Sequence, residues 1–242
     1  MPADPHRIHF MDSRSLEERA RGRPLLILPV GALEAHGPHL PLGSDLIQAE
    51  ETAHALAERL GALVAPGLPY GVCPQTREFP GTVSLPMETL ARMVEDLLGE
   101  FHRSGFRRIL VLSGHGASTH MAALREAAFR AGQNFPDLRV AVLCDYELVY
   151  ELRGTEAPES DGHAGFLETS RVLALAPELV GSSRPAGEYR VPRFLVHPFP
   201  RDAWPESVMG DPANATPEVG RRIQAYVLDR LVEHIRAALP SP

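Results

Sequence analysis

The sequence predicts an α/β fold in which helices cover both faces of a mostly parallel sheet, a three-layer α/β/α sandwich. Short apolar runs with β-branched residues alternate along the chain with longer segments whose apolar residues recur at helical spacing. We find no internal repeat and no low-complexity linker in the sequence. We therefore expect a single domain over residues 1–242.

The first part of the chain predicts two strands and two helices. Residues 25–30, LLILPV, form an uninterrupted apolar run, which is typical of a strand buried on both faces. A helix is expected from about Asp45, because apolar residues then recur every three or four positions as far as Leu60. Residues 62–65 predict a short strand, and residues 87–101 a second helix.

The second part of the chain repeats the alternation. Residues 108–112 predict a buried strand, residues 119–131 a helix and residues 139–143 a further strand. A long polar loop then leads to a helix at residues 165–174, and the final helix is expected at residues 217–238. In such sheets ligands gather beyond the carboxyl ends of the strands, so polar residues that directly follow a strand are candidates for a site.

Composition excludes several classes of protein. The formal net charge of −7 argues against a nucleic-acid binder, which usually presents a basic face. The sequence contains no lysine, so Schiff-base and pyridoxal-phosphate chemistry, a P-loop and a nitrilase-type site are excluded. Apolar runs are too short to cross a membrane and the N-terminus is too polar for a secretory signal, so we expect a cytoplasmic protein without a membrane partner.

The two cysteines are too few for a disulfide framework. Cys144 lies in an apolar strand and is interpreted as buried packing. Cys73 lies in a loop, where we expect it to be more accessible. No pattern of histidine or asparagine supports it as a nucleophile.

The stretch PVGALEAHGPHLPLGSD, residues 29–45, follows the first predicted strand. In an extended segment, Glu34 and His36 project to the same side, and Asp45 at the start of a helix can reach back toward them. These oxygen and nitrogen donors suit zinc, manganese or iron(II). The alternative is that Asp45 caps the helix while Glu34 and His36 are exposed polar residues of a loop.

Two further segments carry candidate residues. In LVLSGHGASTH, residues 110–120, His115 ends a strand between two glycines and is well placed to bind a ligand, whereas His120 is interpreted as structural. In DGHAGFLETS, residues 161–170, His163 and Glu168 lie at the start of a helix. Taken alone, this segment also fits an amphipathic helix whose acidic residues face solvent.

Together these segments resemble the creatininase family of metal-dependent amidohydrolases. Residues 29–45 are similar to its PVG-x-x-E-x-HGPHLPLG-x-D signature, and SGHGAS and HAGFLETS to its NGHGGN and HAG-x-x-ETS motifs. The segments YGVCPQTREFPGTVSL and VMGDPANATPEVGRR also resemble family segments. The matches extend from about residue 25 to residue 222, and they place the chain in the HGGN-type branch rather than with creatininase itself.

The resemblance implies a creatininase-like fold, a site for two divalent metal ions and a homo-oligomer, often a hexamer in this family. Zinc is the first expectation, with manganese or iron as alternatives. The implied metal ligands are Glu34, His36, Asp45, His115 and Glu168. In the creatininase branch a glutamate two residues after the histidine of the turn is a further ligand. That position is Ala117 here, and we expect Glu168 to replace the missing ligand.

The implied reaction is hydrolysis of a C–N amide bond in a cyclic amide, a formamide or a small peptide by a metal-bridged hydroxide. His163 is the expected general acid and base. Creatinine itself is disfavoured, because creatinine-hydrolysing members use tryptophans in a loop that here, at residues 146–160, has none; the only tryptophan is Trp204. A phosphorylated substrate would favour pocket arginines such as Arg77.

Two alternatives belong to other classes. A metal-free serine hydrolase is disfavoured because the sequence has no GxSxG elbow. The other alternative is a non-catalytic family member that binds a small ligand or serves as a subunit of an assembly.

Overall fold

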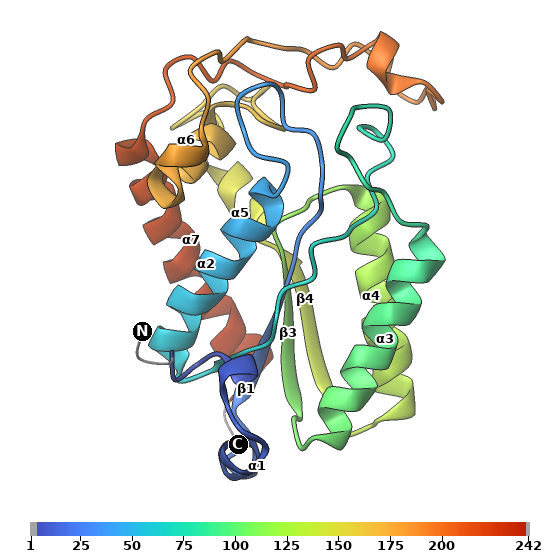
Figure 1. The fold of residues 1–242 in the computed structure, drawn as a ribbon, viewed down its shortest axis with the longest axis vertical. Helices are drawn as coiled ribbons and strands as arrows, with labels where there is room; N and C mark the ends of the chain where they lie inside the picture. The colour runs from blue at the N-terminus through green and yellow to red at the C-terminus, as the bar shows by residue number, and fades with distance from the viewer. Residues whose placement is uncertain (1–3, 241–242) are drawn as a thin grey trace.

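The computed structural model describes residues 4–240. Its sheet has the spatial order β2-β1-β3-β4, and every neighbouring pair of strands is parallel (Figure 1). Within the described chain the strands of this sheet are β1 (Leu25–Val30), β2 (Leu63–Val64), β3 (Arg108–Ser113) and β4 (Arg139–Cys144). Each lies within one residue of a strand expected from the sequence, because uninterrupted apolar runs are what a sheet buried on both faces requires.

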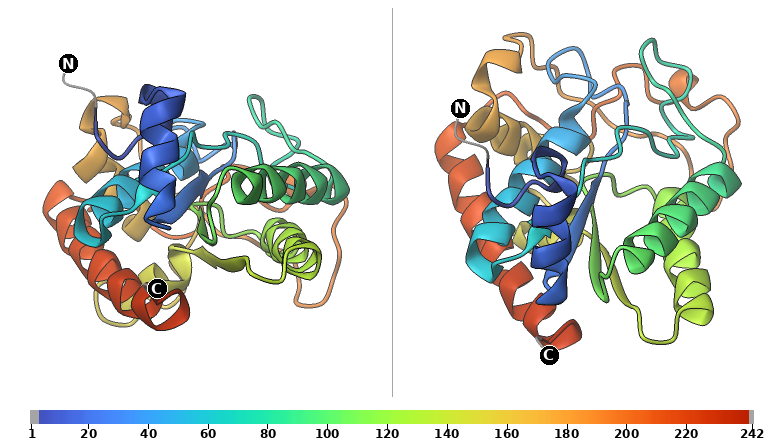
Figure 2. Two further views of the ribbon diagram at one scale, coloured as in Figure 1. Left: turned by 90° about the horizontal axis from the view of Figure 1, so that it is seen from below. Right: turned by 60° about the horizontal axis from the view of Figure 1, so that its bottom comes forward.

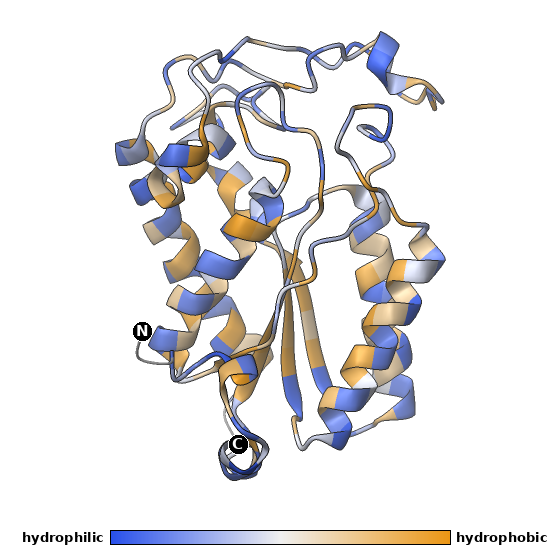
Figure 3. Ribbon diagram, viewed as in Figure 1, coloured by the Kyte–Doolittle hydropathy of each residue, from blue (hydrophilic) through white to orange (hydrophobic). Residues whose placement is uncertain are grey.

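Helices cover both faces of this sheet (Figures 1 and 2). On one face lie α2 (Ser44–Leu60), α6 (Phe166–Leu175) and α7 (Pro217–Ala238), and on the other lie α3 (Met87–Arg103) and α4 (Ser118–Asn134). Their apolar sides face the sheet and each other while polar residues face outward (Figure 3). The predicted three-layer α/β/α sandwich is therefore confirmed.

Two helices were not expected from the sequence. Helix α1 (Ser13–Arg21) is capped at its N-terminus by Asp12, whose carboxylate accepts hydrogen bonds from two backbone N–H groups of the first turn. Only Ala20 of α1 is buried, so the segment carries no apolar pattern to reveal it. The short α5 (Tyr146–Val149) interrupts the segment interpreted as a polar loop. Single 3-10 turns occur at Ile8–Phe10, Tyr150–Leu152, Pro177–Leu179 and Pro200–Asp202.

The carboxyl edge of the sheet contains a topological switch point. The chain leaves β1 for β2 on one side, and returns through α3 to β3 on the other side of β1. The loops that follow β1 and β3 therefore diverge and leave a crevice between them. The segment between α6 and α7, orange in Figure 1, passes over this edge. Among residues 4–240 we find no helix with the length and apolar character needed to cross a membrane.

Close packing between α6 and α7 depends on Gly220. A Cβ atom at this position would overlap the backbone oxygen of Ser170 in α6. We predict that Gly220→Ala separates the two helices and lowers the free energy of unfolding by about 1–3 kcal/mol, measured by urea denaturation. Gly132→Ala in α4 is the matched control, since a Cβ there meets no atom of the described chain within 4 Å. The control should be about 1 kcal/mol more stable, and an equal loss of stability in both variants would contradict the packing argument.

Candidate metal centre

The loop after β1 carries Glu34 and His36 into the interior, where they are 3% and 0% exposed. The backbone N–H of Glu34 donates to the carbonyl of Leu42, and that of Ala35 donates to the hydroxyl of Thr82. These bonds hold the loop in an extended form, so the alternative of exposed polar loop residues is wrong. The hydroxyl of Thr76 donates a short hydrogen bond to Glu34 Oε1.

Backbone carbonyls orient the imidazoles of the centre. A carbonyl oxygen only accepts hydrogen bonds, so the ring nitrogen that faces it carries a proton. His36 Nδ1 donates to the carbonyl of Glu34 at 3.0 Å, and His115 Nε2 donates to the carbonyl of Val72 at 3.1 Å. The opposite nitrogens, Nε2 of His36 and Nδ1 of His115, consequently point toward the buried carboxylates. This is the usual support for a histidine that binds a metal.

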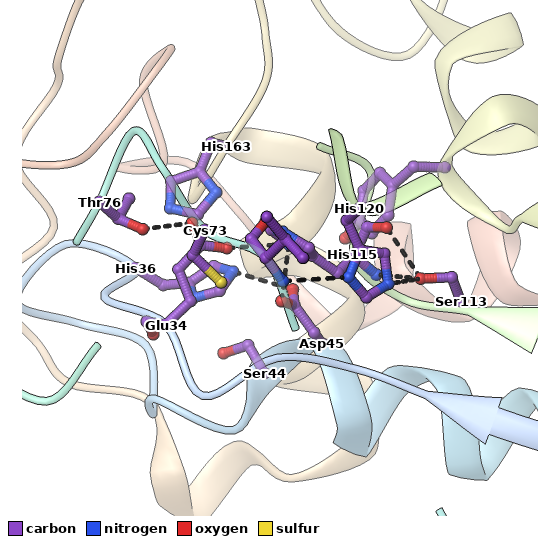
Figure 4. Close-up of polar contacts among 12 residues, drawn as sticks. Glu34, His36, Ser44, Asp45, Cys73, Thr76, Ser113, His115, His120 and His163 are labelled. Carbon is purple, nitrogen blue, oxygen red and sulfur yellow. Dashed lines mark hydrogen bonds and ion pairs between the residues drawn. The ribbon is translucent and has the colours of Figure 1, made fainter. Parts of the chain in front are cut away.

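Asp45 lies between these two imidazoles (Figure 4). Its Oδ1 is 3.1 Å from His36 Nε2, and its Oδ2 is 3.1 Å from His115 Nδ1. Asp45 occupies the first turn of α2, whose N-terminus rests directly on Gly31 and Gly114. The sequence left open whether this aspartate caps the helix or reaches back toward the loop residues, and the structure has it reaching back.

Glu168, in the first turn of α6, approaches the same centre. Its Oε1 is 3.5 Å from His36 Nε2 and accepts a hydrogen bond from Gln48 Nε2 at 3.2 Å. Its Oε2 accepts from the backbone N–H of Ala164 at 2.7 Å. Donor atoms of His36, Asp45 and Glu168 lie within 4.8 Å of one another, so these three residues can share one cation.

Cys73 forms a second group with Glu34 and His115, whose donor atoms also lie within 4.8 Å of one another. The expectation that Cys73 is accessible is wrong: its side chain is fully buried. Two hydrogen bonds hold the loop that carries Cys73 in an inward position. The carbonyl of Val72 accepts from His115, and the backbone N–H of Cys73 donates to Ser84. Burial raises the pKa of the Cys73 thiol. Cys144 is buried at the end of β4, as expected.

His163 lies beside the centre, and one of its ring nitrogens lies within 4.8 Å of donor atoms of Glu34 and His36. Its ring stacks on His36 with centroids 4.2 Å apart, and its Nε2 donates to the carbonyl of Ala35 at 2.8 Å. The next residue, Ala164, has a φ of 53°, a left-handed conformation that is uncommon for a residue other than glycine. The backbone N–H of this same residue holds Glu168, so one strained turn orients both side chains.

Electrostatics of the centre favour a bound cation. Burial acts to raise the pKa of Glu34 and Asp45. The positive charges of nearby histidines, His115 for Glu34 and His36 followed by His115 for Asp45, outweigh this and lower each pKa to about 2. Burial acts to lower the pKa of His36 and His115, yet the facing carboxylates raise both well above the usual value. With Glu168, three carboxylates face two imidazoles, so even fully protonated histidines leave one buried negative charge uncompensated.

The hydrogen bonds point to the same conclusion. Among the described residues, Glu34 Oε2 and Asp45 Oδ2 are buried and accept no hydrogen bond. Both instead face Nδ1 of His115, at 2.9 and 3.1 Å. Buried carboxylate oxygens that lack hydrogen-bond donors are costly unless a cation binds them. The donor set therefore fits divalent metal ions.

A cavity of about 220 Å³ opens onto this centre. Polar residues of the centre form its floor, and aromatic side chains form much of its wall. The wall residues are Tyr146, Tyr150, Tyr189, Trp204 and Met209. Within the described chain no arginine lines the cavity, and Arg77 is exposed outside it.

Several residues of this site were not expected from the sequence. Trp204 lies outside residues 146–160, yet its ring lies 5.1 Å from that of His163, so the lack of a tryptophan in residues 146–160 does not mean that the pocket lacks one. No local pattern marks Trp204 as a pocket residue. Thr76 and Cys73 lie in YGVCPQTREFPGTVSL, a segment singled out only for its resemblance to the family. His120 contacts Ser113 and the backbone of Val72, which agrees with a structural role.

Comparison with known proteins agrees with this geometry. The family model described as creatininase, creatinine amidohydrolase, matches residues 9–235. A creatinine amidohydrolase of Pseudomonas putida is 37% identical over 183 residues, which cover 68% of this chain and 69% of that protein. A mycofactocin precursor peptide peptidase of Mycobacterium tuberculosis is 32% identical over 237 residues, covering 90% of this chain and 87% of that protein.

Solved structures show the same likeness. A structure described as creatininase Mn superposes with a TM-score of 0.88 at 30% sequence identity, and the match covers 97% of this chain and 99% of that one.

We predict that zinc or manganese raises the melting temperature of the chelator-treated protein by several degrees. A ligand that binds only the folded state at about 100 times its Kd adds about 2.7 kcal/mol of stability. Asp45→Asn should lose most of this shift, because Asp45 contacts both histidines. Asp96→Asn, at an exposed ion pair on α3, should keep it. A full shift in Asp45→Asn, measured by scanning calorimetry, would contradict the assignment of Asp45 to the centre.

Proposed function

This chain belongs to the creatininase family of amidohydrolases, and from that premise we propose that it hydrolyses a C–N amide bond at a centre of two divalent cations. The observation that carries the proposal is the convergence of three buried carboxylates on two imidazoles whose free nitrogens face them. Such a centre suits a buried binuclear site and has no evident structural purpose without cations.

The proposed ligands divide into two sets that share Asp45. One cation would be held by His36, Asp45 and Glu168, and the other by Glu34, His115 and the second oxygen of Asp45. In this arrangement Glu168 serves the His36 set, and its replacement of the donor missing at Ala117 stays a prediction. Zinc is our first choice because nitrogen and carboxylate ligands with an open position for water suit it, with manganese and iron as alternatives.

Bound divalent cations supply Lewis acidity, which activates water for attack and polarises the amide carbonyl. His163 performs the proton transfers in our proposal. Because its Nε2 holds a proton against the carbonyl of Ala35, Nδ1 carries the lone pair. That atom can accept a proton from the attacking water and return it to the departing nitrogen, which is a poor leaving group unless protonated. The stacking of His163 on His36 and its contact with Trp204 fix the ring for this role.

We propose a small neutral amide as the substrate. A wall of tyrosines and one tryptophan suits a flat or apolar group, and the cavity of about 220 Å³ limits its size. Because no arginine of the described chain lines the cavity, a phosphorylated substrate is disfavoured. Cyclic amides, formamides and the end of a small peptide fit these limits. A homo-oligomer and a cytoplasmic location stay predictions.

Turnover of such compounds separates the enzyme from the alternative of a non-catalytic subunit that only binds a small ligand. The test is a panel of cyclic amides, N-aryl formamides and dipeptides, assayed with protein reconstituted with zinc, manganese or iron. Hydrolysis of at least one compound, lost on chelation and restored by metal, supports the proposal. Saturable binding of the same compounds without turnover under every metal would favour the binding subunit.

We predict that His163→Ala lowers kcat by about 10²–10⁴, the usual contribution of general acid–base catalysis. Metal content should stay close to that of the unchanged protein, because the proposed ligand sets omit His163. His234→Ala on the exposed face of α7 is the control and should keep full activity. Elemental analysis and steady-state kinetics on the same preparations check both points. Undiminished kcat in His163→Ala would exclude the proposed role.

A further inference from the structure

The loop between β2 and α3 forms one wall of the centre on the His115 side. Its Val72 carbonyl accepts the hydrogen bond from His115 Nε2, and its Thr76 hydroxyl donates to Glu34 Oε1. The backbone N–H of Cys73, between these two residues, donates to Ser84 Oγ at 2.9 Å. The loop therefore positions the ring of His115, the carboxylate of Glu34 and its own thiol together (Figure 4).

The thiol of Cys73 has the position expected of a donor. It is fully buried, and its sulfur lies within 4.8 Å of donor atoms of both Glu34 and His115. Zinc binds sulfur at about 2.3 Å and nitrogen or oxygen at about 2.0–2.2 Å. Donors separated by this amount can therefore share one ion after small rotations of their side chains.

A second observation comes from the carboxylate that faces the thiol. Glu34 is 3% exposed, and its Oε2 accepts no hydrogen bond among residues 4–240, although it forms an ion pair with His115 Nδ1 at 2.9 Å. Ala117, in the turn that carries His115, lines the same cavity but offers no metal donor, because its side chain is only a methyl group. This side of the centre thus holds His115, Glu34 and a share of Asp45. Zinc takes four ligands in structural sites and can expand to five at catalytic centres, so this side can take a fourth protein donor and still admit water.

We propose that Cys73 is that donor: its sulfur is a metal ligand on the Glu34–His115 side and makes this side selective for zinc over manganese. The inference deepens the proposed function, because it rests on the centre binding cations. On binding, the S–H bond breaks, the thiolate joins the cation and the proton passes to solvent. Sulfur ligands select softer ions such as zinc, whereas manganese favours oxygen ligands.

X-ray absorption at the zinc edge tests the proposal directly on the intact protein. With two zinc ions bound per chain, one sulfur per two zinc ions is expected at about 2.3 Å. Cys73→Ser should lose this sulfur signal. Cys144→Ala is the matched control, since Cys144 is the only other cysteine of the sequence and is equally buried, and it should keep the signal.

Affinity gives a second readout that does not depend on catalysis. Cys73→Ser should weaken one of the two zinc sites by more than the roughly 10–100-fold typical of an outer-shell partner, with the manganese affinity reduced much less. Competition titration with a chromogenic chelator measures both metals. The ratio of zinc to manganese affinity should therefore fall in Cys73→Ser and stay constant in Cys144→Ala.

Each other outcome overturns the inference in a distinct way. Two bound zinc ions with only nitrogen and oxygen neighbours would remove Cys73 from the centre while leaving the proposed amidohydrolase intact. A sulfur signal that persists in Cys73→Ser and disappears in Cys144→Ala would assign the sulfur to Cys144. Protein that binds no divalent cation after reconstitution would overturn both the inference and the proposed function. The spectrum of the unchanged protein decides the first and third cases even if a variant fails to fold.

Discussion

The site depends on how closely the N-terminus of α2 approaches the carboxyl ends of β1 and β3. Gly31 and Gly114, which follow these strands, lie directly against the backbone of Asp45 and Leu46, and a Cβ atom at either glycine would overlap it. Only at this separation does Asp45 stand between His36 and His115, with one oxygen toward each imidazole. Glycine is required here for lack of space rather than for backbone freedom.

Hydrogen bonds from the surrounding shell hold each charged group in one orientation. Backbone carbonyls bind the far nitrogen of each imidazole, and Thr76, Gln48 and the N–H of Ala164 bind carboxylate oxygens. Gln48 is itself held by Tyr146, which also lines the cavity. Assembling three carboxylates without solvent opposes folding. A site in which two imidazoles can compensate only two of three buried carboxylates is therefore arranged for binding cations rather than for the stability of the empty chain.

The two parts of the site come from different kinds of structure. The candidate ligands follow strands or begin helices, so the rigid sandwich positions them. The segment between α6 and α7 instead supplies Tyr189, Trp204 and Met209 to the cavity wall, and Ser207 Oγ shares the carbonyl of Ala35 with His163. Such a division lets the wall of the pocket vary while the chemistry of the centre stays the same.

By itself, the sequence determined the strands and most of the helices, because apolar periodicity is a local property. The expected ligands, which did not include Cys73, came from strand-end motifs together with the resemblance to a family. The segments of α1 and α5 escaped prediction, since α1 buries a single residue and α5 spans one turn. Only the tertiary structure decided which donors meet: Glu168 with His36, Cys73 with Glu34 and His115, and Trp204 with His163. These contacts join residues from segments far apart in the sequence. The distances between them depend on helix packing and chain crossovers, which no local pattern encodes.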